Sequence, residues 1–229
     1  MRIEFMGMTG AGKSTLAQGV CARLRAAGHR VALAPDGLIY RHRRLLRVYK
    51  ILNVAGYCAR HPLRALAAAR AVRGFRQPNG AGWWRLLFNW LYVNAAMSRR
   101  GRPRRLLVLE QGVAQGLYSL ALQADRTDGV LFRRALAAGE RPELVVFVEA
   151  PCEVVSARMR GRAATYTATE RLLLADGELM AKSVRSLGAI ARALEEQRVP
   201  VQRCDTHLLS AAAAADAVAA AILQRLAPT

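Results

Sequence analysis

Short apolar runs alternate with longer stretches of helical character along this chain. Turn residues end several of these runs, as Pro35-Asp36-Gly37 does after the second one. Strands that alternate with helices favour an α/β fold, in which helices cover both faces of a parallel sheet. The pattern predicts five strands, at Arg2–Met6, Val31–Ala34, Leu106–Leu109, Leu144–Val148 and Val199–Cys204.

The stretches between these strands predict helices. Gly28 ends the first helix, and breaks such as His61-Pro62 separate the helices of the middle segment. One long stretch, Glu170–Gln197, is predicted to be mostly helical. The other expected helices are Ser14–Ala27, His42–Ala59, Pro62–Phe75, Gly82–Ser98, Gly116–Ala124, Leu131–Ala138, Glu153–Arg160 and Leu208–Leu226.

Composition favours one globular domain over all 229 residues. Apolar residues make up 53% of the chain and charged residues 22%, which allows a large core and excludes global disorder. The longest uncharged apolar runs, such as Leu86–Ser98, are shorter than the roughly 18 residues of a spanning helix. We expect no secretory signal, because the first residues are predicted to form a strand and a functional loop. We therefore expect a cytoplasmic protein, with buried reduced thiols at Cys21, Cys58, Cys152 and Cys204.

The formal net charge of +19 is concentrated in one segment. Residues 37–109 contain 16 Lys and Arg and no Asp or Glu, whereas the other 156 residues carry 19 basic and 16 acidic side chains. Such a field attracts phosphates, nucleic acid or anionic lipid, although a solvated basic face is the simpler alternative. We expect residues 38–105 to form a basic helical insertion that binds the acceptor substrate.

Two helices of this insertion have marked side-chain patterns. The predicted helix Gly82–Ser98 is rich in aromatic side chains, which could stack on a base, hold a lipid or pack in the core. They are Trp83, Trp84, Phe88, Trp90 and Tyr92. The predicted helix His42–Ala59 has the pattern of a basic amphipathic helix at an anionic membrane surface. The alternative is an ordinary helix with one solvated face and one face in the core. On a helical wheel Arg43, Arg47 and Lys50 share one of its faces, and Leu45, Tyr49 and Leu52 share another.

Residues Gly7–Ser14 match the phosphate-loop motif GxxxxGK[ST] in full, between a predicted strand and a predicted helix. Glycines allow successive backbone N–H groups to converge on a phosphate, and the helix N-terminus adds its positive dipole. We expect Lys13 to bind the β- and γ-phosphates and to act in catalysis, and the Ser14 hydroxyl to ligate Mg²⁺. The predicted nucleotide-binding residues here are Gly7, Thr9, Gly10, Ala11, Gly12, Lys13, Ser14 and Thr15.

Acidic residues follow the predicted strands at the edge where a ligand would bind. Glu110 ends the third strand, and we expect it near Mg²⁺ or the acceptor, as a metal ligand or a catalytic group. Asp36 follows the second strand and could orient an acceptor hydroxyl or take its proton. Turn formation in Pro35-Asp36-Gly37 explains Asp36 nearly as well. Glu149, at the end of the fourth strand, is predicted to be structural or to support the site indirectly.

Arginines cluster after the fourth strand, in Arg158-Met159-Arg160-Gly161-Arg162. Phosphoryl transfer requires cations around the moving phosphoryl group, and the guanidinium fork suits phosphate oxygens. We predict a lid over residues 150–168, with Arg158 and Arg162 catalytic and Arg160 on the nucleotide. The alternative is a surface arginine cluster in an arginine-rich chain.

This order of parts resembles thymidylate kinase and its relatives, the nucleoside and nucleoside-monophosphate kinases of the P-loop class. The resemblance implies a P-loop NTPase three-layer fold with a five-stranded parallel sheet, a helical lid, ATP and Mg²⁺. It also places Asp205 on the adenine side of the nucleotide. The matching pieces are the phosphate loop, Glu110-Gln111-Gly112, Tyr118-Ser119, the lid from Pro151 to Arg162, Leu179–Glu195 and Cys204-Asp205-Thr206.

Two positions depart from this family's pattern. Thymidylate kinases have Arg after the strand-end acid, where this chain has Gln111, and a Glu-Pro-Gly-Gly loop where it has Pro35-Asp36-Gly37. Residues 38–104 match no family pattern. Loss of the acceptor Arg, with Asp36 and Glu110 present, favours a hydroxyl acceptor, whereas the many arginines favour an anionic one.

We therefore expect an ATP-dependent kinase that phosphorylates a small, anionic acceptor, such as a nucleoside monophosphate, a nucleoside or another phosphorylated metabolite. The alternative is a P-loop ATPase switch that acts on an anionic membrane or on nucleic acid through the basic segment. A GTPase is disfavoured because the chain has no NKxD motif. The expected partners are ATP and the acceptor. Nucleic acid is disfavoured, and a peripheral membrane contact and a homodimer stay open.

Overall fold

The computed structural model describes residues 1–34, 43–76, 80–98, 105–124, 127–161 and 168–227. Within these residues a parallel five-stranded sheet has the order β2-β3-β1-β4-β5. The sheet confirms the predicted fold class and strands. Its strands are β1 (Arg2–Gly7), β2 (Arg30–Ala34), β3 (Arg105–Leu109), β4 (Leu144–Glu149) and β5 (Val201–Asp205).

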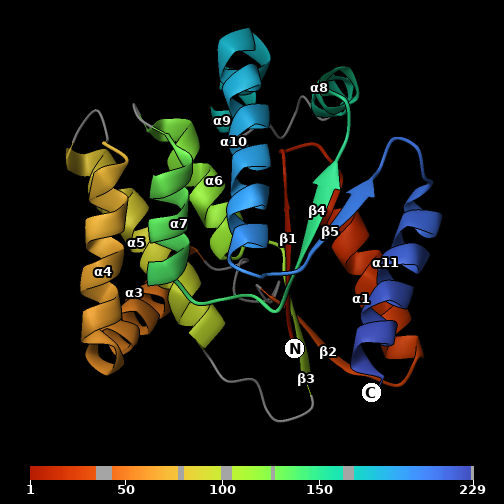
Figure 1. Ribbon diagram of the computed structural model, residues 1–229, viewed down its shortest axis with the longest axis horizontal. Coiled ribbons are helices and arrows are strands. Elements are labelled where there is room, and N and C mark those ends of the chain that lie inside the picture. Colours follow the sequence, from red (N-terminus) through yellow and green to blue (C-terminus); the bar gives the residue numbers. More distant parts are fainter. Residues whose placement is uncertain (35–42, 77–79, 99–104, 125–126, 162–167, 228–229) are drawn as a thin grey trace.

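Helices cover both faces of the sheet, which gives the three-layer core (Figure 1). On one face α1 (Lys13–Ala26) packs against α11 (Ala211–Leu226), and on the other lie α6 (Val113–Gln123) and α10 (Gly177–Glu196). Outside α6 and α10 lies a further helical layer. It contains α3 (Arg43–Arg60), α4 (Pro62–Gly74), α5 (Gly80–Ser98) and α7 (Gly129–Ala138).

The core lies along the central strands. β1 and β4 are buried over nearly their whole length, because both neighbouring strands and both helical layers cover them. The second strand, β2, is an edge strand in which only Val31 is buried. None of the described helices combines the length and apolar character that a membrane span requires.

The stretch Glu170–Gln197 is mostly helical, as predicted, and it contains two helices. α9 (Ala168–Ala175) ends before Asp176, and α10 begins after it. The Asp176 carboxylate accepts hydrogen bonds from the backbone N–H groups of Glu178, at 2.9 Å, and Leu179, at 3.0 Å. This N-cap stabilises a new helix start, which the helical period alone does not reveal.

The cysteines are all free, as predicted, but only two of them are buried. Cys21 and Cys204 lie in the core, whereas Cys58 and Cys152 are partly exposed. The expectation of four buried thiols is therefore wrong for Cys58 and Cys152, which lie on α3 and on α8 (Cys152–Arg160).

The basic segment folds into the three predicted helices, but its buried and exposed side chains differ from the predicted faces. Trp90 is buried against α6, where Gly116 leaves room for its ring, whereas Trp84 is exposed. The Lys50 ammonium lies 4.8 Å from the centre of the Tyr92 ring on α5, and burial lowers the pKa of Lys50. Lys50 therefore faces α5, and the exposed Leu52 lies on the outer side. The predicted basic and apolar faces of α3 are wrong for these two residues.

Glu4 is a charged residue fully buried in the central strand β1. Its Oε1 accepts a hydrogen bond of 2.8 Å from the backbone N–H of Gln115, and a Cβ on Gly112 would lie 2.3 Å from its carboxyl carbon. Burial raises the pKa of Glu4 to about 7, against the lowering effect of the backbone N–H groups of residues 112–115. The start of α6 is therefore built around this carboxyl group.

Glu4→Gln should change how stability depends on pH. The folded-state pKa of about 7 exceeds the ordinary 4.5, so between these values the folded state holds a proton that the unfolded state has lost. Wild-type stability therefore falls as pH rises through this window, by about 3 kcal/mol in all. We expect the variant to gain stability relative to wild type by this margin between pH 4 and pH 8, measured by urea unfolding. A difference that does not vary with pH would contradict the assignment.

Candidate active site

The phosphate loop joins the end of β1 to the first turn of α1. Gly10 and Gly12 have φ values of 89° and 95°, in the left-handed region that glycine adopts without strain. The Gly7 N–H donates a hydrogen bond of 3.1 Å to the Gln115 side-chain oxygen, which links the loop to the start of α6. The start of α6, which Glu4 positions, therefore holds the phosphate loop in place.

Lys13 lies over this loop. Its ammonium donates hydrogen bonds of 2.9 Å to the carbonyl oxygens of Gly7 and Met8. The charge therefore lies beside the backbone that the motif assigns to phosphate binding. Among the other predicted loop residues, Ser14 and Thr15 are exposed, Thr9 is half-buried, and Ala11 is buried.

Ser14 and Glu110 meet at one side of the loop. The Ser14 hydroxyl donates a hydrogen bond of 2.9 Å to Glu110 Oε2, although the two residues come from α1 and from the end of β3. A hydroxyl and a carboxylate oxygen are the hard ligands that Mg²⁺ prefers, so these residues fit the predicted metal. No group of three or more His, Cys, Asp or Glu among the described residues could hold a metal ion.

Arg158 and Thr206 lie on the other side of the loop. The Arg158 guanidinium donates to the Thr206 hydroxyl oxygen at 2.9 Å and to the Thr206 carbonyl oxygen at 2.8 Å. The Thr206 hydroxyl in turn donates to the Ala11 carbonyl oxygen at 2.7 Å. The first arginine of the predicted lid is therefore held against the loop backbone. Sequence reasoning gave Thr206 no role of its own, because only the strand order brings it to the loop.

The remaining predicted site residues are less closely tied to the loop. The Asp205 carboxylate accepts from the backbone N–H groups of His207, at 2.7 Å, and Leu208, at 3.2 Å, so it shapes the turn after β5. Arg160 is exposed at the end of α8. Asp36 and Arg162 lie outside the described residues.

Two further groups of the predicted pattern have structural contacts. Glu149 pairs with Arg203 at 2.9 Å, at the ends of β4 and β5. The Tyr118 hydroxyl is 2.6 Å from the Ser183 hydroxyl in the interior, where it joins α6 to α10. Gln111, which stands where the resembled family has Arg, is exposed.

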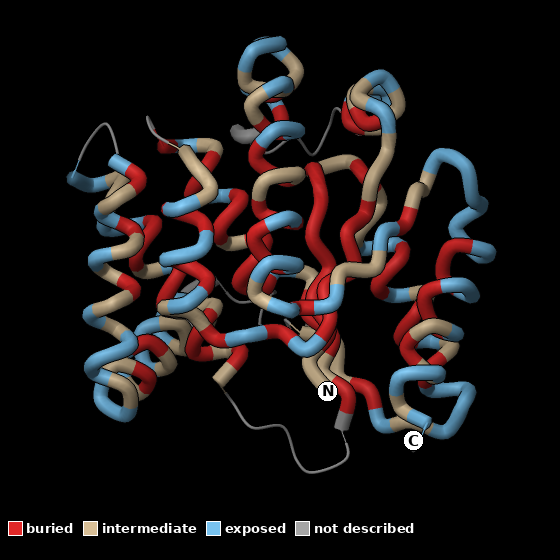
Figure 2. The backbone as a smooth tube through the Cα atoms, in the orientation of Figure 1, coloured by how far each residue is buried: buried red, intermediate tan, exposed pale blue. Residues whose placement is uncertain are grey.

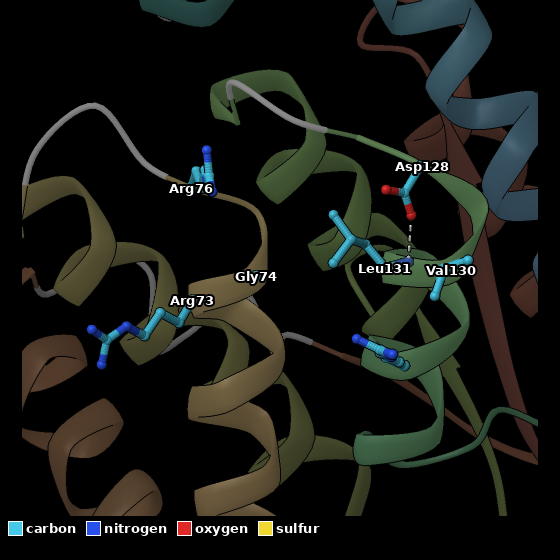
Figure 3. A pocket seen from close by; sticks show the side chains of 7 residues that line it. Arg73, Gly74, Arg76, Asp128, Val130 and Leu131 are labelled. Atoms are coloured by element: carbon cyan, nitrogen blue, oxygen red, sulfur yellow. Dashed lines mark hydrogen bonds between the residues drawn. The ribbon is translucent and has the colours of Figure 1, made fainter.

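A separate pocket of about 400 Å³ lies between the C-terminal end of α4 and the N-terminal end of α7 (Figure 3). Arg73, Arg76 and Asp128 line it, and the Asp128 carboxylate caps α7 by accepting from the Leu131 N–H at 2.8 Å. The Arg73 side chain points away from Asp128. The pocket includes no residue of the phosphate loop, and its labelled arginines do not converge, so we assign it no ligand.

Comparisons with known proteins place the fold. No protein-family model and no curated protein matches the chain. Deoxyadenosine kinase from M. mycoides, solved with its products dCMP and dCDP, has 11% sequence identity and a TM-score of 0.59, over 98% of this chain and 100% of that one. A second structure of that enzyme, with dCTP bound, gives 14% and 0.50, over 99% and 98%.

Thymidylate kinase from Ehrlichia chaffeensis has 10% identity and a TM-score of 0.53, over 99% of this chain and 98% of that one. Identities this low establish the fold and not the activity. The chain therefore has the fold of deoxyadenosine kinase and thymidylate kinase, as the sequence resemblance predicted.

Proposed function

We propose that this protein is an ATP-dependent kinase that transfers the γ-phosphoryl group to a small, anionic acceptor. The observation that carries the proposal is the contact between Ser14 and Glu110 beside Lys13, in a chain with this fold. A phosphate loop alone is sufficient to bind nucleotide. The Glu110 carboxylate beside the Ser14 hydroxyl adds a group that could bind Mg²⁺ or act on the acceptor.

In this proposal each side of the loop has a distinct task. Lys13 binds the β- and γ-phosphates of ATP, and Ser14 and Glu110 hold Mg²⁺. Bound Mg²⁺ neutralises charge on the phosphate oxygens. Arg158, oriented by Thr206, contributes positive charge from the opposite side, and Arg160 and Arg162 complete the lid over the nucleotide.

The acceptor is proposed to bind on the side of the basic helices. Residues 37–109 carry 16 cationic side chains and no acid, and an anionic ligand would offset their mutual repulsion. Asp36 or Glu110 would position or deprotonate the reacting group. The similar solved enzymes act on nucleosides and nucleotides, which supports acceptors of these classes.

The acceptor class can be tested directly. Purified protein, labelled ATP and Mg²⁺ are incubated with separate panels of nucleosides, nucleoside monophosphates and other phosphorylated metabolites. We expect transfer to at least one panel and slow ATP hydrolysis without an acceptor. Hydrolysis that no acceptor changes, but that lipid vesicles or nucleic acid stimulate, would favour the alternative of an ATPase switch.

Lys13→Met should lower phosphoryl transfer by about a hundredfold or more while the fold is retained, because the ammonium contacts loop carbonyls and phosphates rather than the core. The measurement is initial rate with the best acceptor, together with circular dichroism and urea unfolding. Arg192→Met, on the exposed side of α10, is the matched control and should retain wild-type rate. Full activity of a folded Lys13→Met protein would remove the kinase proposal.

Thr206→Val should weaken ATP binding more than acceptor binding. The substitution removes the hydroxyl that Arg158 and Ala11 share, so the guanidinium loses its orientation beside the loop. We expect the KM for ATP to rise about tenfold with a smaller change in the KM for the acceptor. Equal effects on both constants, or effects also seen with the exposed control Arg185→Ala, would rule out this role for Thr206.

A further inference from the structure

The outer side of α3 is apolar and exposed. Val48, Ile51 and Leu52 have 55%, 56% and 67% of their surface accessible, and Ala55 and Ala59 are exposed beside them. These positions recur at intervals of three and four residues, so they form one continuous stripe on the helix. We call this stripe, with its neighbour Arg47, the α3 face.

This exposure is not a consequence of poor packing of α3 as a whole. The opposite side of the helix is anchored, because Val54 and Tyr57 are buried and Lys50 lies over the Tyr92 ring of α5. α3 therefore has one apolar side packed against the rest of the protein and a second apolar side exposed to solvent. An exposed apolar stripe of this kind marks an interaction surface in a protein with a complete core.

The next helix has a similar outer side. Leu63, which follows α3 closely, is 81% exposed, and Leu66 is also exposed, with the exposed arginines Arg70 and Arg73 one to two turns further along. Exposed positions recur along the outer side of α4 at the left of the molecule (Figure 2). Apolar and basic side chains thus share the outer surface of both helices.

The charge of this surface has one sign. Arg47 lies four residues before Ile51 and therefore next to it on the helix. Within the described part of the chain, Arg47 and Arg70 form no ion pair, and residues 37–109 contain no acidic side chain. The surface therefore has unneutralised positive charge beside apolar groups.

We propose that the α3 face docks on an anionic lipid surface. Its apolar side chains enter the boundary between headgroups and acyl chains, and Arg47 beside them contacts lipid phosphates. This combination of exposed apolar and basic side chains without acids is what an anionic bilayer recognises. The docking is independent of phosphoryl transfer.

The same charge argues against two other occupants. A symmetric contact with a second copy would place the α3 face of one chain on that of the other, with arginines opposed and no acid in the segment to pair with them. Nucleic acid would satisfy the arginines but would leave the branched apolar side chains against phosphates and water. A bilayer satisfies both kinds of side chain.

The test is vesicle flotation of the full-length protein without ATP. The vesicles contain phosphatidylcholine alone, or phosphatidylcholine with about one third phosphatidylserine. We expect co-flotation with the anionic vesicles alone, and loss of the bound fraction as ionic strength rises. Absence of binding to anionic vesicles at low ionic strength would overturn the proposal.

Two variants separate the apolar from the electrostatic contribution. Ile51→Asn with Leu52→Asn should lower partition onto anionic vesicles about tenfold, and Arg47→Gln should lower it about fivefold. The matched control is Leu172→Asn with Val184→Asn, at similarly exposed positions on α9 and α10, and it should bind as wild type.

The alternative that the α3 face mediates self-association is tested by measuring the oligomeric state. Light scattering after size exclusion is measured for wild type and for the Ile51→Asn, Leu52→Asn protein. A dimer in wild type that this variant abolishes would assign the α3 face to self-association and overturn the proposal. An equal loss of vesicle binding in the control variant would overturn it as well. Phosphoryl transfer by the wild-type protein is measured separately, in solution without vesicles, so failure of docking is distinct from failure of the proposed kinase function.

Discussion

A carboxyl group buried in the central strand holds the start of α6 and, through it, the phosphate loop. Glu4 accepts from the Gln115 N–H, and the Gln115 side chain accepts from the Gly7 N–H. Only a glycine at position 112 allows the backbone to pass this close to the carboxyl group. Burial of an acid is costly, and here the backbone N–H groups at the start of a helix offset part of that cost. The same turn carries Glu110, so the loop and the Glu110 carboxylate share one support.

The sheet order explains why the loop has two chemically different sides. β1 lies between β3 and β4, so the loop that follows it has the end of β3 on one side and the ends of β4 and β5 on the other. Glu110 reaches Ser14 from the first side, and Arg158 and Thr206 reach Ala11 from the second. Negative and positive groups are thereby separated across the loop, which suits a metal ion at one side and a phosphate-binding cation at the other.

The basic helices also have two sides. Their inner side is well anchored, because Trp90 packs on α6 and the Asn94 side-chain amide donates to the Trp90 carbonyl oxygen at 2.8 Å. Their outer side carries the exposed α3 face. In the two proposals this acid-free segment binds two kinds of anion, a small anionic acceptor and anionic lipid, which offset its charge. A kinase built in this way would act beside a membrane surface.

The sequence by itself determined the phosphate loop, the strands and nearly all helix positions, because these depend on local spacing and on residues close in the chain. Even the split at Asp176 follows from a local cap that periodicity overlooked. Tertiary structure alone decided which distant groups meet. Glu110 reaches Ser14 because β3 pairs with β1, and Arg158 is held by Thr206 because β5 pairs with β4. A helical wheel likewise separates the faces of α3, but packing on α5 decided that Lys50 turns inward and Leu52 outward. Periodicity encodes the shape of each element, whereas its partners depend on how the whole chain buries its apolar surface.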